Sequence, residues 1–145
     1  MKDLLSKVSF KAVILGALVN IIGTNVWGFI LISYVISTHG LAGLPVSELT
    51  HQLTNAINDD LLLKSLNWIM GGLFSILGGF IASQIAKKYI LLNAGLSSFI
   101  CVALVGYGAI SAIGSSAFFW SILAVPLNIL LALIGGFIYK KTKRS

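Results

Sequence analysis

Residues 89–139 read YILLNAGLSSFICVALVGYGAISAIGSSAFFWSILAVPLNILLALIGGFIY and contain no Asp, Glu, Lys or Arg. An α-helix rises about 1.5 Å per residue, so roughly 20 apolar residues cross the hydrocarbon core of a bilayer. This stretch is too long for one crossing and suits two crossings joined by a tight turn. The segment rich in turn-forming residues inside it is 111–117. We therefore predict transmembrane helices at about 89–110 and 118–139, with an outer turn at 111–117.

Two further uncharged stretches precede this one. Residues 12–47 predict one crossing at about 10–36, and residues 65–86 predict another. Backbone groups in lipid must be hydrogen-bonded within their own segment, and no stretch alternates with the period of a strand. We expect an all-α integral membrane protein, in which four transmembrane helices form one antiparallel bundle. The predicted remainder of this single domain, 1–145, is an outer loop at 37–64 and an inner loop at 87–88.

The composition supports the membrane assignment. Of the 145 residues, 57% are hydrophobic and 10% are charged, and the mean hydropathy is +0.98. A soluble domain carries about 25% charged residues, and a disordered chain combines low hydrophobicity with high charge. Both classes are therefore excluded. The single cysteine, Cys101, also excludes thiol-oxidising enzymes that need a cysteine pair.

Basic residues are distributed unevenly around the four predicted helices. With four crossings, both termini and the 87–88 loop fall on one side of the membrane, and every Lys and Arg except Lys64 lies there. The side richer in Lys and Arg is the cytoplasmic one, so we expect both termini in the cytoplasm. The same bias argues against dimers in which the chain inserts both ways round. The residues concerned are Lys2, Lys7, Lys11, Lys87, Lys88, Lys140, Lys141, Lys143 and Arg144.

The predicted outer loop carries the pattern of a short amphipathic helix. Leu or Ile recurs every four residues from Leu49 to Leu61, with polar side chains between, and Pro45 provides a helix start. We expect this helix to lie along the outer membrane surface or to cap the bundle. Its polar residues include candidate metal ligands, but one Glu-x-x-His pair without a second copy favours ordinary solvated side chains. The candidate ligands are His39, Glu48, His51, Asp59 and Asp60.

Small and polar residues recur at intervals of four along the predicted membrane helices. In lipid no hydrophobic force drives helices together, so close packing relies on small residues and on polar side chains that bond across helices. We predict that these stripes face one another as the packing surface of the bundle. In the alternative interpretation, a path for a solute is lined by Asn20, Thr24, Asn25, Ser75 and Asn128. The residues are Gly16, Asn20, Thr24, Gly28, Gly71, Ser75, Gly79, Ser83, Asn128, Ala132 and Gly136.

Several kinds of site are not predicted. Ion and proton pathways usually contain an ionisable residue inside the membrane, and the four predicted spans have no charged residue apart from Lys11 at the start of the first. We find no phosphate-binding loop and no Ser/His/Asp set at one membrane depth, and we expect no catalytic, cofactor-binding or metal site. The basic tail at 140–144 lies beside a membrane helix, where anionic lipid headgroups explain it better than nucleic acid does.

Residues 78–88 read GGFIASQIAKK, and the third predicted helix opens with Leu92-Asn93-Ala94-Gly95-Leu96. With the opening segment Phe10–Val19, these motifs resemble small four-span bacterial membrane proteins of unknown function. In that group a Gly-Gly-aromatic-x-Ala-x-x-x-Ala-basic run ends the second helix, although Gln84 stands here where a basic residue is common. The resemblance implies a bacterial inner-membrane location and no particular activity. The Gly-Gly-Phe-Ile sequence recurs at 135–138, also ahead of basic residues, as a tandem hairpin duplication would produce.

These observations together favour a non-enzymatic role. We expect a multi-pass inner-membrane protein that acts as an accessory or interaction component. Its expected partners are membrane lipid and either itself or another membrane protein, without nucleic acid or cofactor. The alternative is a small oligomeric channel or transporter for a neutral or anionic solute, with Asn20, Thr24 and Asn128 facing the path.

Overall fold

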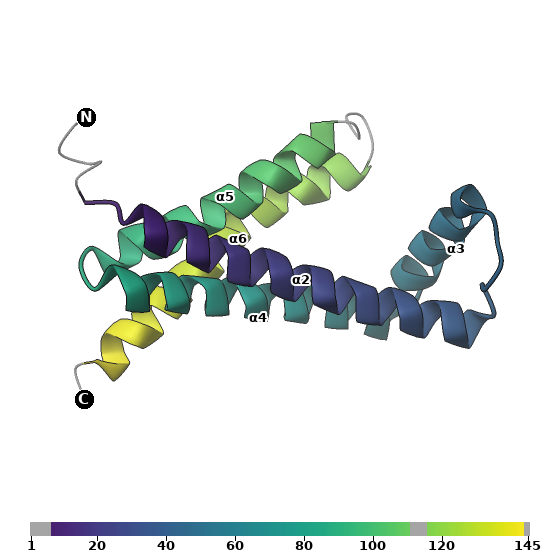
Figure 1. The fold of residues 1–145 in the computed structure, drawn as a ribbon. Coiled ribbons are helices and arrows are strands. Elements are labelled where there is room, and N and C mark those ends of the chain that lie inside the picture. Colours follow the sequence, from purple (N-terminus) through teal and green to yellow (C-terminus); the bar gives the residue numbers. More distant parts are fainter. Residues whose placement is uncertain (1–6, 111–115, 144–145) are drawn as a thin grey trace. The chain divides into compact units, whose positions relative to one another are not determined.

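The computed structural model describes residues 7–110 and 116–143, with side chains for residues 7–103 and 124–143. Every regular element in these residues is a helix, which confirms the all-α prediction (Figure 1). The helices, in chain order, are α2 (Phe10–His39), α3 (Val46–Asp59), α4 (Leu61–Ala86), α5 (Ile90–Ile110) and α6 (Ser116–Thr142).

Three segments are long and apolar enough to cross a membrane. They are Phe10–His39, Leu61–Ala86 and Ala124–Thr142. The part of α5 with described side chains, Ile90–Ala103, is also apolar but is shorter than a span. The membrane character predicted from the sequence therefore holds for three helices.

The helix boundaries differ from the predicted ones for local reasons. Helix α2 continues to His39, where Gly40 adopts a φ of +64° and the Leu41 amide donates to the Ile36 carbonyl at 3.1 Å. This left-handed glycine and its hydrogen bond form a Schellman motif, so the end of α2 is determined by the local sequence. Helix α6 includes residues 116–117 of the predicted outer turn, and the remaining turn residues, 111–115, lie outside the described chain.

Asp60 connects α3 to α4. Its amide donates to the Ala56 carbonyl at the end of α3, and its Oδ1 accepts hydrogen bonds from the amides of Leu62 (2.8 Å) and Leu63 (3.2 Å). A carboxylate in this position satisfies amides that have no partner within the helix. Helix α4 therefore begins at Leu61, earlier than the predicted residue 65, and includes Lys64 in its first turn.

Asp60→Ala is expected to loosen the first turn of α4 by about 1 kcal/mol, because the cap is lost. The amides of Leu62 and Leu63 should exchange their hydrogens roughly fivefold faster. Asp59→Ala is the matched control, since it removes the same charge from the neighbouring position at the end of α3. Equal exchange rates in the two variants would contradict the capping role.

The contacts divide the chain into two compact units. Unit 1 comprises Met1–Ile22 with Gly72–Ser145, and unit 2 comprises Gly23–Gly71. Unit 1 thus contains the first part of α2, the last part of α4, and the helices α5 and α6, which lie side by side (Figure 1).

Unit 2 has a conventional apolar core. Leu31 and Val35 of α2 and Leu63 of α4 are buried together. The partly buried residues packed against them include Leu53, Ala56 and Ile57 of α3, so the predicted amphipathic helix is present and applies its apolar face to this core. Leu61, the last member of the predicted apolar row, belongs to α4 instead and is 79% exposed. The remaining members of the cluster are Trp27 and Leu41.

Unit 1 has the opposite distribution of side-chain sizes. Its buried residues are almost all Gly, Ala, Ser or Asn, with Val13 the largest aliphatic one among the described residues. Its large apolar side chains face outward, including Phe99 at 57%, Leu130 at 57% and Phe137 at 60% exposure. A soluble protein rarely exposes a large continuous apolar surface. Unit 1 therefore has the pattern expected of helices surrounded by lipid, where small residues sit at the helix contacts.

Candidate functional site

The candidate site is the surface along which the helices of unit 1 meet. We call the residues that form this surface the seam. Each is small or polar and each is buried except Asn128, which is half-buried. The seam consists of Ala12, Gly16, Ala17, Asn20, Ser75, Gly78, Gly79, Ala82, Ser83, Ala94, Ser97, Ser98, Asn128, Ala132, Gly135 and Gly136.

Gly16 and Gly78 bring α2 and α4 into backbone contact. A Cβ added at Gly16 would lie 2.6 Å from the Gly78 carbonyl oxygen, and one added at Gly78 would lie 2.6 Å from that of Gly16. Ala82 and Ser97 close the same contact, because their Cβ atoms would lie 2.7 and 3.0 Å from a Cβ at Gly16. No side chain fits at either glycine unless the helices move apart.

The two Gly-Gly-Phe-Ile sequences lie at the contact between α4 and α6. A Cβ on Gly79 would fall on the backbone of Ala132, and one on Gly135 would fall on the carbonyl of Ile76. Gly136 provides space for α5, because a Cβ there would lie 2.9 Å from both Ala94 Cβ and Ser83 Oγ. Helix α4 thus packs closely against both α2 and α6.

A polar triad connects α2, α4 and α6 within the seam. Asn20 Nδ2 donates to Ser75 Oγ at 3.2 Å, and Ser75 Oγ donates to Asn128 Oδ1 at 2.6 Å. Asn128 Nδ2 donates in turn to the Ala124 carbonyl at 2.9 Å. Asn20 and Ser75 are buried. These side chains bond to one another across the helices, an arrangement that suits helix association in lipid.

Three of the eleven predicted site residues belong to unit 2. Thr24 is exposed, and a Cβ added at Gly28 or Gly71 would meet no atom of the described chain within 4 Å. Asn25, the additional path candidate, is exposed as well. The other eight predicted residues all belong to the seam.

Asn93 is a structural residue that the stripe analysis missed. It is fully buried, and its Oδ1 accepts the Ser9 amide at 2.7 Å while its Nδ2 donates to the Tyr89 carbonyl at 3.0 Å. Lys87 and Tyr89 have positive φ values of 55° and 47° in the turn that Asn93 supports. A lone Asn at the start of an apolar helix is the signal that the sequence offers, but its partner Ser9 is far away in the sequence.

Ser97 and Ser98 are two further buried serines of α5. Ser97 Oγ donates to the Ala94 carbonyl at 2.7 Å, which satisfies the hydroxyl within its own helix. Ser98 Oγ has no hydrogen-bond partner within residues 7–110 and 116–143. The two hydroxyls act as small side chains that allow close approach, as predicted for Ser in membrane helices generally.

The candidate metal ligands of the loop make separate local contacts. His51 Nδ1 pairs with Asn55 Nδ2 at 3.2 Å, and His39 Nδ1 lies 3.2 Å from the Val35 carbonyl oxygen. Asp60 caps α4, as described above. No group of three or more His, Cys, Asp or Glu side chains in the described residues is arranged to hold a metal ion.

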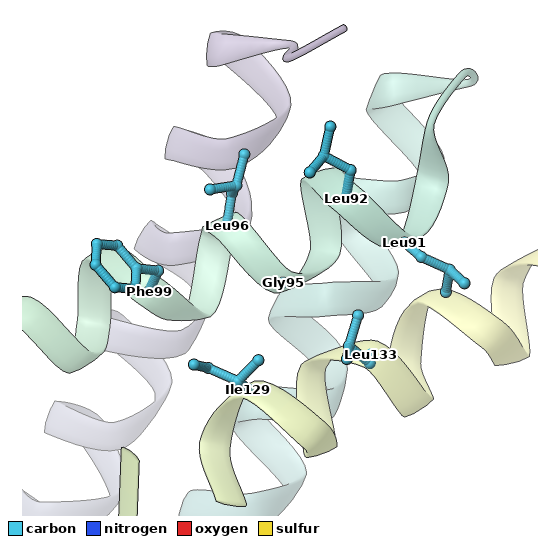
Figure 2. A pocket seen from close by; sticks show the side chains of 7 residues that line it. All are labelled: Leu91, Leu92, Gly95, Leu96, Phe99, Ile129 and Leu133. Carbon is cyan, nitrogen blue, oxygen red and sulfur yellow. The ribbon is translucent and has the colours of Figure 1, made fainter. Parts of the chain in front are cut away.

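An apolar groove runs along the outside of unit 1 between α5 and α6 (Figure 2). Its volume is about 400 Å³, and Gly95 leaves it open at its centre. The other lining residues are Leu91, Leu92, Leu96 and Phe99 of α5 and Ile129 and Leu133 of α6. The groove offers shape and apolar surface, without a polar side chain to orient a reacting group.

Comparison with known proteins gives no relative. No protein-family model, curated protein or solved structure matches the chain. The seam and the groove are therefore interpreted from their own geometry, which is suited to helix packing and apolar contact.

Proposed function

We propose that the chain is a four-span protein of a bacterial inner membrane and acts as a non-enzymatic accessory or interaction component. The observation that carries the proposal is the outward placement of large apolar residues around a buried seam of small ones in unit 1. Lipid is the partner that such a surface requires, and a second copy of the chain or another membrane protein would pack on the same surface.

Four crossings are supported by helix length. Helices α2, α4, α5 and α6 contain 30, 26, 21 and 27 residues. Even the shortest, α5, corresponds to about 32 Å and would reach across a hydrocarbon core of roughly 30 Å. Four crossings place the basic residues near both termini and at 87–88 on the cytoplasmic side. The resemblance of residues 78–88 to small bacterial inner-membrane proteins supports the same location.

Cysteine labelling tests this topology. In a Cys101→Ser background, Ser115→Cys should react with a membrane-impermeant maleimide in intact cells, and Ser145→Cys should not. Lysed cells provide the control, because both cysteines should then react. Labelling of position 145 in intact cells, or of both positions alike, would overturn the four-span arrangement.

The accessory role is favoured over conduction by how the polar side chains are used. Asn20, Ser75 and Asn128 are hydrogen-bonded in series. The backbones of α2 and α6 each come into contact with the backbone of α4. A conduction path needs polar groups that face a space through which the solute moves. The groove described above is apolar and lies on the outside of unit 1.

Purified protein in liposomes is expected to release a neutral sugar or an anionic dye no faster than protein-free vesicles. Reproducible flux that Asn20→Leu abolishes would overturn the accessory role and establish conduction. Asn67→Leu is the matched control, because Asn67 is an exposed residue of α4 outside the triad.

Extraction into polymer nanodiscs should yield the chain with a second polypeptide, or a second copy, in fixed ratio.

A further inference from the structure

The groove between α5 and α6 lies directly beside the basic end of unit 1. Leu91 begins the groove three residues after Lys88. On the other helix, Gly136 packs against Ala94 and Leu91, and Lys140 follows one turn later. Both lysines therefore lie beyond the Leu91 end of the groove, Lys88 in the turn before α5 and Lys140 near the end of α6.

The N-terminal segment adds positive charge to this end. The Lys7 carbonyl lies 3.5 Å from Asn93 Nδ2, and Lys7 Nζ lies 5.6 Å from the centre of the Tyr89 ring. The described residues of unit 1 contain no Asp or Glu to balance these charges. Basic clusters at the cytoplasmic ends of membrane helices attract anionic lipid headgroups.

We propose that this groove binds one acyl chain of an anionic phospholipid whose phosphate contacts Lys88 and Lys140. The inference rests on the proposed four-span arrangement, which places both lysines at the cytoplasmic headgroup level. The apolar lining then begins just below that level, where the acyl chain of a lipid begins. Gly95 provides the space that a side chain would otherwise fill, and a Cβ added there would have Leu133 Cδ2 as its nearest neighbour, at 3.5 Å.

The length of the groove favours a lipid chain over a transmembrane helix. From Leu91 to Phe99 the groove extends for about 12 Å along α5. A helix that crosses the membrane is apolar along roughly 30 Å, so this groove would cover less than half of it. A second copy in parallel orientation would also bring a second set of basic residues to the same end, and like charges would repel.

Native mass spectrometry of the delipidated full-length protein tests the site. Dioleoyl phosphatidylglycerol should form a one-to-one complex at about a tenfold lower concentration than dioleoyl phosphatidylcholine. Lys88→Gln with Lys140→Gln should reduce phosphatidylglycerol binding to the phosphatidylcholine level. Lys64→Gln is the control for charge, because Lys64 belongs to unit 2. Equal binding of the two lipids by the unmodified protein would overturn the proposal.

Groove variants test the acyl-chain contact separately. Gly95→Leu should weaken binding of both lipids about tenfold, and Leu96→Asn should do so without adding bulk. Ala103→Leu is the control, because Ala103 is exposed on α5 outside the groove. Unchanged binding in both groove variants would overturn the site, as would displacement of the lipid by free glycerol phosphate. A dimer that Gly95→Leu dissociates would instead assign the groove to a second copy.

The topology experiment separates this inference from the function on which it rests. If position 115 alone is labelled in intact cells and the two lipids bind equally, only the lipid site fails. If position 145 is labelled, the membrane arrangement fails first, because the lysines would then lie elsewhere.

Discussion

Gly79→Leu is expected to separate α4 from α6 and to lower the melting temperature of the detergent-solubilised protein by about 10 °C. Even the first carbon of the new side chain would fall on the backbone of Ala132, so the two helices must move apart. Overpacking of a close contact typically costs about 1–3 kcal/mol and occasionally more. We expect the upper end of that range, because the obstructing atoms are backbone and cannot rotate away.

Gly71→Leu is the matched control for this prediction. It makes the same substitution two turns earlier in the same helix, where an added Cβ meets no described atom within 4 Å. Its melting temperature should stay within about 2 °C of the unmodified protein, because a substitution that meets no neighbouring atoms is expected to change stability by less than about 0.5 kcal/mol. If the two variants have the same melting temperature, the close approach at Gly79 does not stabilise the contact between α4 and α6.

Ser75→Ala is expected to destabilise the protein by about 2 kcal/mol. The variant removes the hydroxyl that accepts from Asn20 and donates to Asn128, so the buried Asn20 and the half-buried Asn128 both lose this partner. A buried polar group left without its partner costs about 1–3 kcal/mol, whereas a single hydrogen bond within a membrane protein averages only about 0.6 kcal/mol. Thermal unfolding should show a melting temperature lower by about 5 °C.

Ser65→Ala provides the comparison for the triad. Ser65 lies on the same helix and is exposed, so its hydroxyl is not part of the seam. The substitution is chemically identical and should leave the melting temperature almost unchanged. A loss of stability as large as that of Ser75→Ala would mean that the effect comes from the helix itself and not from the triad.

The predictable parts of this molecule depend on local sequence. Runs without charge predict long helices, and the pattern from Leu49 onward predicts the amphipathic helix, because both signals lie within one element. The predicted start of α4 is wrong because it was placed directly after the charged residue Lys64. In the structure, Asp60 caps α4, and Lys64 lies in the first turn of this helix.

The arrangement of the seam was only partly accessible from sequence. Intervals of four identified Gly16, Asn20 and Ser75 as neighbours on their own helices. The same interval continues to Gly28, where an added Cβ meets nothing nearby in the described chain. A stripe makes contact only where a neighbouring helix runs alongside it. The course of that neighbour cannot be read from the sequence of the helix that carries the stripe. Asn93 escaped for the same reason, since its role depends on Ser9.

The hydrogen bond between Ser9 and Asn93 joins residues separated by 84 positions. During translation, a nascent chain that ends before residue 93 lacks the acceptor for the Ser9 amide. The segment that precedes α2 therefore reaches its final form only after the first turn of α5 has been synthesised. A nascent chain that has completed only α2 and α4 therefore still lacks the hydrogen bond that ties Ser9 to α5.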